Sequence, residues 1–478
     1  MKCISNVVIA SILLLFAGCG SGAKKESAVN GALGKDGEIK LMVLAPGHFH
    51  ASLLQKNDLS LLNDSTIALI SDSVYVYAPS GAELEQYLAN IDQYNHRSEN
   101  PTQWKERVYT GTDFLEKMLA DKKGNVVVLA GNNRDKTRYI FESVKAGIHV
   151  LSDKPMAVNK ENFHLLEQAY DSARAHHVLI YDMMTERYDA LNIIERKLLH
   201  HQELFGKLET GTSDNPAIYM ESVHHFYKEV SGNPLIRPAW YYDVEQQGEG
   251  IADVTTHLID LVNWKCFPEQ VINYLKDVDV VDATHWPTEL SLADFARSTG
   301  MDAFPDYLGK YIKDSKLQVY ANGTIYYRVK DVNVALKVVW NYQAPQGGGD
   351  TFTAYIKGSR ATLKTVQDKS HQFIKQLYIE KGNKTDAVAF ETALNQAMTE
   401  IQNDYPQVSA KAVSGKEGVY LIDIPVEIRE PHEAHFGYVG KQFFNYLIGQ
   451  DLPEWENSNT LAKYFITTTA VEKAKENK

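Results

Sequence analysis

Short apolar runs alternate with helical stretches between residues 38 and 190, and this alternation constrains the fold more than any other feature of the chain. The apolar runs lie at residues 39–45, 74–77, 125–130 and 178–181. Helical stretches follow at 84–91, 114–119 and 136–146, and Asn159 is a suitable N-cap for a further helix. Continuous apolar runs are typical of parallel strands that are buried on both faces. The pattern therefore predicts a doubly wound α/β fold.

The first of these strands leads into the turn Pro46-Gly47-His48-Phe49-His50, and a helix begins near Ala51. Strand, tight turn and helix form the start of a dinucleotide-binding unit. Ala45, Gly47 and His50 occupy the three glycine positions of G-x-G-x-x-G, so only the glycine that lets backbone approach a pyrophosphate remains. The second strand leads into Ala78-Pro79-Ser80-Gly81 instead of the usual acidic residue for the ribose. This leaves the choice between NAD and NADP open.

Polar turns follow two later strands of the same region. Gly131-Asn132-Asn133-Arg134 comes after the run at 125–130, and Asp153-Lys154-Pro155 ends the strand that starts near Gly147. In a doubly wound fold, turns at the carboxyl ends of the strands face the ligand. The residues expected to bind the cofactor are therefore Gly47, His48, Phe49, His50, Ser80, Asn132, Asn133, Asp153, Lys154 and Pro155.

A second stretch, residues 248–264, is predicted to form one helix entered from a glycine turn. At about 100° per residue, Ile251, Val254, Leu258 and Leu261 share an apolar face, and Asp253, His257 and Asp260 share another. Asp253 and His257 are four residues apart, so their side chains can meet. A carboxylate beside an imidazole can raise its pKa, which suits a general base near neutral pH. An isolated pair of this kind is equally consistent with a surface contact or a satisfied core histidine, and Asp260 is expected to cap or orient.

Aromatic and imidazole residues gather just before this helix. Because aromatic faces with polar tips suit sugar rings, the predicted substrate-binding residues are His225, Trp240, Tyr241, Tyr242 and Asp253. Packing in the core is the alternative role for the aromatic residues. His432 and His435 are three residues apart, but no third ligand is visible, so no metal site is expected.

Three local patterns resemble those of the Gfo/Idh/MocA family of oxidoreductases. Asp153-Lys154-Pro155 is similar to the family's Glu-Lys-Pro, with Asp in place of Glu. Asp253-x-x-x-His257-x-x-Asp260 resembles its second signature, and Thr185-Glu186-Arg187-Tyr188 stands where the family has an Arg-rich stretch. The resemblance covers roughly residues 38–450. Arg237-Pro238-Ala239-Trp240 and His432-x-x-His435 resemble a Bacteroidetes-type subgroup of exported members.

The resemblance implies a Rossmann dinucleotide-binding domain at residues 38–190 and a C-terminal α+β domain at residues 191–478. The second domain would hold a large open, mostly antiparallel sheet, which could also build a homo-oligomer. The sequence is compatible with strands at 325–329, 335–342, 351–357 and 377–380, and with helices at 436–448 and 461–474.

The resemblance also implies roles for three catalytic residues. Lys154 would contact the reacting oxygen and the cofactor, Asp253 would hold a substrate hydroxyl or orient the pair, and His257 would be the general base. The implied activity is a nicotinamide-dependent oxidation of a carbohydrate or polyol hydroxyl. One alternative is an NAD-dependent glycosidase that works by transient oxidation, elimination and re-reduction, with Tyr241, Tyr242 or His225 as the extra acid or base. A second alternative is a non-catalytic sugar-binding lipoprotein.

The N-terminus indicates export. Lys2 and the apolar stretch 4–16 resemble a signal peptide over residues 1–18, and Phe16-Ala17-Gly18-Cys19 resembles a lipobox. Lipid on Cys19 and a flexible tether at 19–37 would hold the protein in the periplasm, at the outer membrane, with the lipid as its sole membrane contact. The alternative is an ordinary signal peptide with a chance cysteine. Cys3 would leave with the signal and Cys19 would carry the lipid, so Cys266 would be the remaining free cysteine and no internal disulfide could form.

Two further expectations concern partners. The net charge of −12 argues against nucleic acid as a partner. Free NAD(H) is scarce outside the cytoplasm, so an exported enzyme would keep its cofactor tightly bound. That cofactor is NAD or NADP, with NAD slightly favoured.

Overall fold

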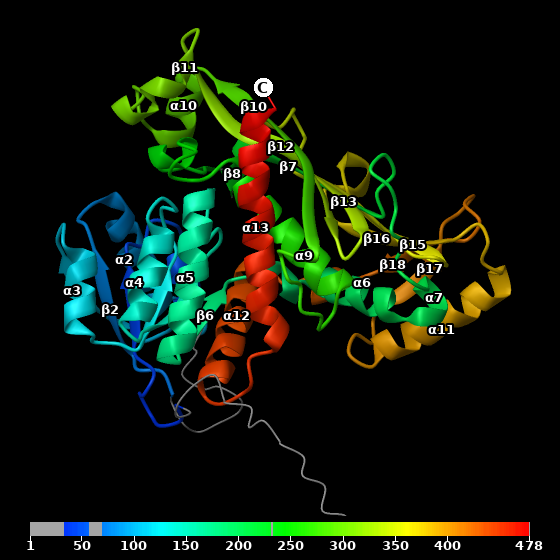
Figure 1. Cartoon of the computed structure of the whole chain (residues 1–478), viewed down its shortest axis with the longest axis horizontal. Helices are drawn as coiled ribbons and strands as arrows, with labels where there is room; N and C mark the ends of the chain where they lie inside the picture. The colour runs from blue at the N-terminus through cyan, green and yellow to red at the C-terminus, as the bar shows by residue number, and fades with distance from the viewer. Residues whose placement is uncertain (1–32, 57–68, 231–232, 478) are drawn as a thin grey trace, which may run out of the picture.

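The computed structural model describes residues 33–56, 69–230 and 233–477. The predicted signal peptide, Cys19 and most of the tether lie outside the described residues. The described part forms two domains with a pair of C-terminal helices between them (Figure 1). Within the described residues, no helix is long and apolar enough to cross a membrane.

The N-terminal domain is built on a sheet of parallel strands in the order β3-β2-β1-β4-β5-β6. This is the strand order of a dinucleotide-binding Rossmann fold, so the predicted fold is confirmed. Its strands are β1 (Leu41–Leu44), β2 (Ser73–Ala78), β3 (Lys105–Thr110), β4 (Val126–Leu129), β5 (His149–Ser152) and β6 (Ile180–Asp182). Its helices are α1 (His50–Leu53), α2 (Ala82–His96), α3 (Phe114–Asp121), α4 (Lys136–Lys145) and α5 (Lys160–His176).

The local sequence explains most of these elements. Every residue of β1, β4 and β5 is buried, as expected for central parallel strands with helices on both faces. α5 begins where predicted, because the Asn159 side chain accepts a hydrogen bond from the amide of Asn162 at 2.8 Å. β3 was not predicted, because its largely exposed polar residues lie at the edge of the sheet and show no apolar pattern.

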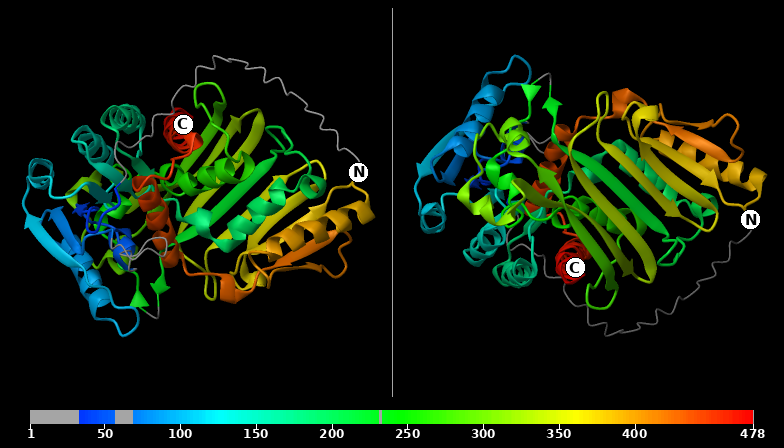
Figure 2. Two further views of the ribbon diagram at one scale, coloured as in Figure 1. Left: turned by 90° about the horizontal axis from the view of Figure 1, so that it is seen from below. Right: turned by 90° about the horizontal axis from the view of Figure 1, so that it is seen from above.

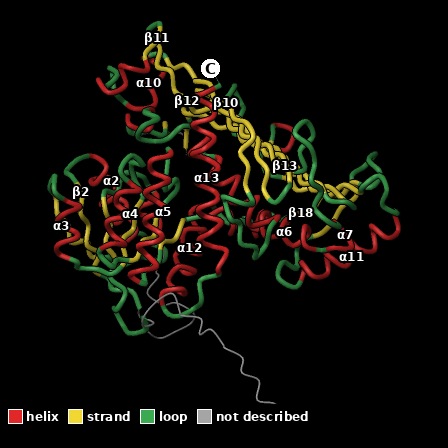
Figure 3. Tube along the Cα trace, viewed as in Figure 1, coloured by secondary structure: helices red, strands yellow, loops and turns green. Residues whose placement is uncertain are grey.

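The C-terminal domain is built on a large sheet in the order β10-β12-β13-β7-β14-β15-β16-β18-β17, with β11 paired to β12. Its pairings are antiparallel except for β13 and β7, so the predicted open, mostly antiparallel sheet is confirmed. Figure 3 shows these strands crossing the domain. They are β7 (Ile218–Tyr227), β10 (Val278–Leu290), β11 (Ile312–Lys313), β12 (Lys316–Val329), β13 (Val332–Gln343), β14 (Thr351–Lys357), β15 (Ala361–Gln367), β16 (Gln376–Lys381), β17 (Ser409–Ala412) and β18 (Val419–Asp423).

Helices cover one face of this sheet, whereas most of the opposite face carries none (Figure 2). The helices of the domain are α6 (Ala190–His200), α7 (Gln202–Phe205), α8 (Gly250–Asp253), α9 (Thr255–Cys266), α10 (Leu292–Thr299) and α11 (Ala387–Gln402). The short strands β8 (Glu229–Val230) and β9 (Asn233–Pro234) form a separate pair. The 3-10 turns η2 (Thr185–Tyr188) and η3 (Ala239–Tyr242) matter for the site below.

The chain ends with two helices that return to the first domain. α12 (His432–Leu447) buries Phe436, Phe443 and Phe444 in the same apolar cluster as Val43 of β1. α13 (Glu454–Glu476) packs against α5, α9 and β10, and it runs between the two domains (Figure 1). The N-terminal domain is therefore completed by residues from the far end of the chain.

The predicted single helix over residues 250–264 is wrong in detail. α8 ends at Asp253, Val254 lies in a turn, and α9 starts at Thr255. Of the predicted apolar face, Ile251, Val254 and Leu258 pack in the core of the second domain. Position 250 must be glycine, because a Cβ there would clash with the backbone carbonyl oxygen of Ala321.

Candidate active site

Lys154 and Asp253 meet at the junction of the two domains. Lys154 follows β5, Asp253 ends α8, and the Lys154 ammonium donates to Asp253 Oδ1 at 2.6 Å. The second carboxylate oxygen, Oδ2, accepts from the Gln247 amide at 3.0 Å. Burial lowers the pKa of Lys154, but the Asp253 and Asp153 carboxylates outweigh burial and raise it above its usual value. Burial raises the pKa of Asp253, yet the Lys154 charge holds it below its usual value, so both groups stay ionised.

His257 does not form the expected pair with Asp253, because Asp253 is already held by Lys154. Burial, followed by the nearby Lys154 charge, lowers the pKa of His257 to about 3. The expectation of a raised pKa is therefore wrong. His257 Nδ1 is buried without a hydrogen-bond partner, so the imidazole is neutral at pH 7 and free to take up a proton.

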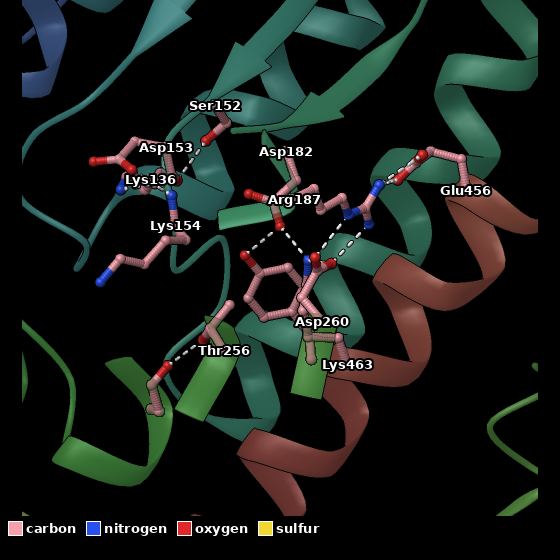
Figure 4. Close-up of polar contacts among 12 residues, drawn as sticks. Lys136, Ser152, Asp153, Lys154, Asp182, Arg187, Thr256, Asp260, Glu456 and Lys463 are labelled. Atoms are coloured by element: carbon pink, nitrogen blue, oxygen red, sulfur yellow. Dashed lines mark hydrogen bonds and ion pairs between the residues drawn. The ribbon is translucent and has the colours of Figure 1, made fainter. Parts of the chain in front are cut away.

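Asp153 precedes Lys154 and holds the turn in place. Its Oδ1 accepts from the Lys154 amide at 2.8 Å, and its Oδ2 lies 2.9 Å from His50 Nδ1. The backbone carbonyl of Asp153 accepts from the buried ammonium of Lys136 at 3.2 Å. Burial lowers the pKa of Lys136 to about 8. Lys136, Asp153 and Lys154 lie together in Figure 4.

A segment of the second domain, residues 239–249, covers the turn that follows β4; we call it the clasp segment. The Asn132 amide donates to Gln246 Oε1 at 2.7 Å, and the Asn133 amide donates to the Gln247 carbonyl at 2.8 Å. At the other end of the clasp segment, the Trp240 indole N–H donates to Glu83 on α2. Both predicted cofactor-binding asparagines are thus engaged by the second domain.

The turn after β1 lies at the carboxyl edge of the parallel sheet, where a dinucleotide binds in this fold. A Cβ on Gly47 would come within 3.0 Å of Glu83 Oε2 and 3.5 Å of the Asn132 backbone nitrogen, so a side chain there would crowd Glu83. The amides of Gly47 and His48 both donate to the Ala130 carbonyl, each at 3.2 Å. A dinucleotide would therefore depend on side chains more than on the usual amides of the glycine turn.

A cavity of about 550 Å³ opens beside His257. Its lining mixes apolar and polar side chains and includes several groups from η2 and α12 that can ionise. Its lining includes Glu186, Asp189, Ser222, His224, Val254, His257, Leu258, Leu261, Asp350, Lys375, Arg429, Glu430, His432 and His435. The Lys375 charge, the largest influence, holds the pKa of Glu186 far below its usual range. The cavity has the size and the hydrogen-bonding capacity for a small polyhydroxylated ligand.

Asp260 is structural. Arg187 forms a bidentate ion pair with Asp260, with both bonds at 2.7 Å, and also pairs with Glu456 at 2.8 Å. Lys463 of α13 bridges Asp260 and Asp182 at 3.0 and 2.8 Å. Figure 4 shows these side chains converging on Asp260. The network ties η2 and α9 to α13.

The other predicted site residues are dispersed. Pro155 is buried behind Lys154, Phe49 is 51% exposed, and Ser80 is exposed after β2. Tyr241 lies near Lys154, and the Arg237 guanidinium stacks over its ring at 4.5 Å.

Tyr242 and His225 do not line the cavity beside His257. Tyr242 is 1% exposed and packs against Phe226 in the core. His225 pairs with Asp350 at 2.9 Å and lines a second cavity of about 520 Å³.

Sequence reasoning missed several residues of the site. Glu83 lies in the first turn of α2, a few residues beyond the position where an acidic group was sought. Lys136, at the start of α4, could have been found as a lysine on the first turn after a polar loop. Glu186 belongs to Thr185-Glu186-Arg187-Tyr188, which was compared with the family's Arg-rich stretch, but no role was predicted for the glutamate. No local pattern connects His432, His435 and Lys375 to His257.

The comparisons with known proteins agree with this arrangement. Residues 51–182 match the family described as "Oxidoreductase family, NAD-binding Rossmann fold", and residues 194–475 match "Putative oxidoreductase C terminal domain". The crystal structure of "a putative oxidoreductase from Parabacteroides merdae" is 46% identical, with a TM-score of 0.90, and the match covers 94% of this chain and 100% of that chain. The chain belongs to the Gfo/Idh/MocA oxidoreductase family. The resemblance inferred from the three motifs is thus confirmed.

More distant structures share the fold. Levoglucosan dehydrogenase in complex with NADH and levoglucosan is 13% identical, with a TM-score of 0.57, over 92% of this chain and 98% of that chain. The WlbA dehydrogenase from Bordetella pertussis in complex with NADH and UDP-GlcNAcA is 15% identical, with a TM-score of 0.51, over 93% of this chain and 97% of that chain. Among curated proteins, none matches this chain.

Proposed function

We propose that this protein is a nicotinamide-dependent oxidoreductase that acts on a carbohydrate or polyol hydroxyl. The observation that carries the proposal is the ion pair of Lys154 and Asp253 near a neutral His257, which lines a cavity with several ionisable groups. A proton acceptor, a fixed cation and a hydroxyl-binding cavity are what the oxidation of an alcohol requires. The family relationship also supports the proposal, because residues 51–182 match an NAD-binding Rossmann fold.

In this mechanism, a substrate hydroxyl lies between Lys154 and His257. His257 takes the hydroxyl proton as the carbon–hydrogen bond breaks, and the Lys154 ammonium stabilises the negative charge that develops on the oxygen. Asp253 and Gln247 hold Lys154 in position through the hydrogen bonds described above. A bound nicotinamide would supply the hydride acceptor.

A second candidate is redox-neutral cleavage of a glycosidic bond. It is favoured by Glu186 and His432, whose side chains line the same cavity as His257 and approach each other to 3.7 Å. Once a ring carbon is a ketone, the neighbouring C–H is acidic and a second base can remove its proton as the aglycone leaves. Water then adds, and the hydride returns to the ketone. Glu186 and His432 replace His225 and Tyr242 as the residues we assign to this second proton transfer.

We further propose that the protein is an exported lipoprotein that retains its cofactor. The support is the sequence Phe16-Ala17-Gly18-Cys19 after an apolar stretch. Export would make exchange with free cofactor inefficient, so the clasp segment would hold a resident NAD or NADP. Cys19→Ser should move the protein from the membrane fraction to the soluble fraction; an unchanged membrane fraction would contradict lipid attachment.

The deciding experiment is to denature the purified protein and analyse the supernatant for nicotinamide dinucleotides by mass spectrometry. Near-stoichiometric NAD or NADP is expected, and it would identify the cofactor. If no nucleotide is released and none binds when added, the oxidoreductase proposal fails. A sugar-binding lipoprotein would then be the better account.

A further inference from the structure

We propose that His48, His50 and Asp153 form a binding site for a divalent transition-metal ion of the zinc class. In the part of the chain that the structure describes, these three residues form a group whose ligand atoms all lie within 4.8 Å of one another. Two imidazole nitrogens and one carboxylate oxygen are a ligand set that suits zinc, iron and manganese. The site does not depend on the proposed reaction.

The spacing of the ligand atoms matches a tetrahedral ion. Asp153 Oδ2 lies 2.9 Å from His50 Nδ1 and 3.5 Å from His48 Nδ1. Metal–ligand bonds of about 2.0–2.1 Å in a tetrahedron separate neighbouring ligand atoms by about 3.3 Å. The remaining pair, from His48 and His50, lies within 4.8 Å, so a single ion can contact all three residues once the side chains adjust.

The ligands are held by their surroundings, as in established metal sites. Asp153 is 3% exposed, and its other oxygen accepts from the Lys154 amide at 2.8 Å. The His50 ring packs on Phe436 of α12, with ring centroids 4.5 Å apart. The side chain of His48 is 28% exposed, so an ion there would keep one open position toward the outside of the turn.

The charges around the group decide what the open position would accept. Lys136 donates to the Asp153 carbonyl at 3.2 Å, whereas the charge of Lys154 is neutralised by Asp253. A divalent ion beside Lys136 would favour an anion, such as hydroxide or a phosphate oxygen, as its fourth ligand. Such an ion would supply the anion affinity that the Gly47 and His48 amides have given up to Ala130.

The site differs from the pair that suggested metal binding in the sequence. His432 and His435 lie next to each other on α12, with ring centroids 6.0 Å apart, and do not belong to the group of three. The group instead joins the turn after β1 to the turn after β5. These turns adjoin the same edge of the parallel sheet but are separated by about a hundred residues in sequence, so periodicity along one helix could not reveal the group.

The test is calorimetric titration with zinc sulfate of the untagged full-length protein, after treatment with a chelator and dialysis. One zinc ion per chain is expected, with a dissociation constant below micromolar. His48→Ala and His50→Ala should each weaken binding by at least roughly 100-fold. His164→Ala, which removes an exposed histidine that pairs with Glu167 at 3.0 Å, should leave binding unchanged. Nucleotide content is measured on the same samples, so failure of the metal site and failure of the proposed function are distinguishable.

Two results would overturn the proposal. One is the absence of zinc binding tighter than micromolar in the wild-type protein. The other is stoichiometric binding that persists unchanged in both histidine variants. Circular dichroism shows whether each variant folds, and His48→Ala, at the partly exposed position, serves if His50→Ala does not fold.

Discussion

Lys154 and Asp253 lie 99 positions apart in the chain, yet their side chains form an ion pair of 2.6 Å that joins the two domains. Each charge is buried and compensates the other. Removing one residue would therefore leave the other charge buried without a partner. The pair therefore serves both chemistry and domain contact.

Lys154→Met should abolish most turnover. The substitution removes the cation that stabilises the developing oxyanion, so kcat should fall by about 10²–10⁴-fold. The measurement is the rate of nicotinamide reduction at its near-ultraviolet absorbance, with a sugar that the wild type turns over. Lys316→Met, at an exposed pair with Glu289, is the control and should retain full activity. Full activity of Lys154→Met would remove the assigned mechanism.

His257→Ala should be equally inactive while keeping its fold. His257 is the neutral imidazole beside the cavity, and without it no proton acceptor is placed at the hydroxyl. Single-turnover reduction of the bound nicotinamide should be slowed by about 10²–10⁴-fold. The circular dichroism spectrum should match the wild type. An active variant would transfer the base role to Glu186 or His432.

His257 should also make stability depend on pH. Its pKa is about 3 in the folded protein and near its ordinary value of 6.5 when unfolded, so the unfolded chain binds more protons between these values. Its contribution is complete above pH 6.5 and is lost as pH falls toward 3. Between pH 7 and 4.5, denaturant unfolding should show that the wild type loses up to about 2–3 kcal/mol more than His257→Ala. Equal losses in both proteins would show that His257 is not the group responsible.

The buried network around Asp260 should carry much of the contact between α9 and α13. Asp260→Ala leaves the Arg187 and Lys463 charges partly uncompensated and should cost about 3–5 kcal/mol of unfolding free energy. Lys411→Ala breaks an exposed pair with Asp423 and should cost at most about 1 kcal/mol. Denaturant midpoints measure both, and a small effect of Asp260→Ala would mean that water enters the network.

The clasp segment should slow the release of bound cofactor. Trp240→Phe keeps the ring but removes the indole N–H that donates to Glu83, which loosens the segment. Nucleotide retained after dialysis should fall by several-fold relative to the wild type. Tyr326→Phe, at an exposed tyrosine of β12 outside the segment, should not change retention. Unchanged retention in Trp240→Phe would exclude the segment as a barrier to release.

Local sequence was sufficient for the parts of the fold in which periodicity and burial agree. The apolar runs around Val43 and Val128 predicted buried parallel strands, and Asn159 predicted the start of a helix. β3 escaped because an edge strand needs no apolar pattern, and the break at Val254 escaped because helical periodicity continues through it.

The site was predictable where its residues stand in compact motifs, as Lys154 and Asp253 do. The ion pair between these two residues could not be predicted, because a contact between domains produces no periodic pattern in the sequence. The same reason explains the wrong pKa direction for His257: the carboxylate four residues earlier was assumed to face it, while the fold gives that carboxylate a lysine. His432 and Lys375 reach the cavity only through the tertiary packing of α12 and β16.

The packing of α12 into the first domain has a consequence for biosynthesis. The apolar cluster that surrounds Val43 lacks Phe436, Phe443 and Phe444 until the ribosome has made nearly the whole chain. The nucleotide-binding half therefore cannot finish folding while the second half is still being synthesised. The first domain of a nascent chain therefore stays incompletely packed until α12 emerges, and such a state would suit the export proposed above.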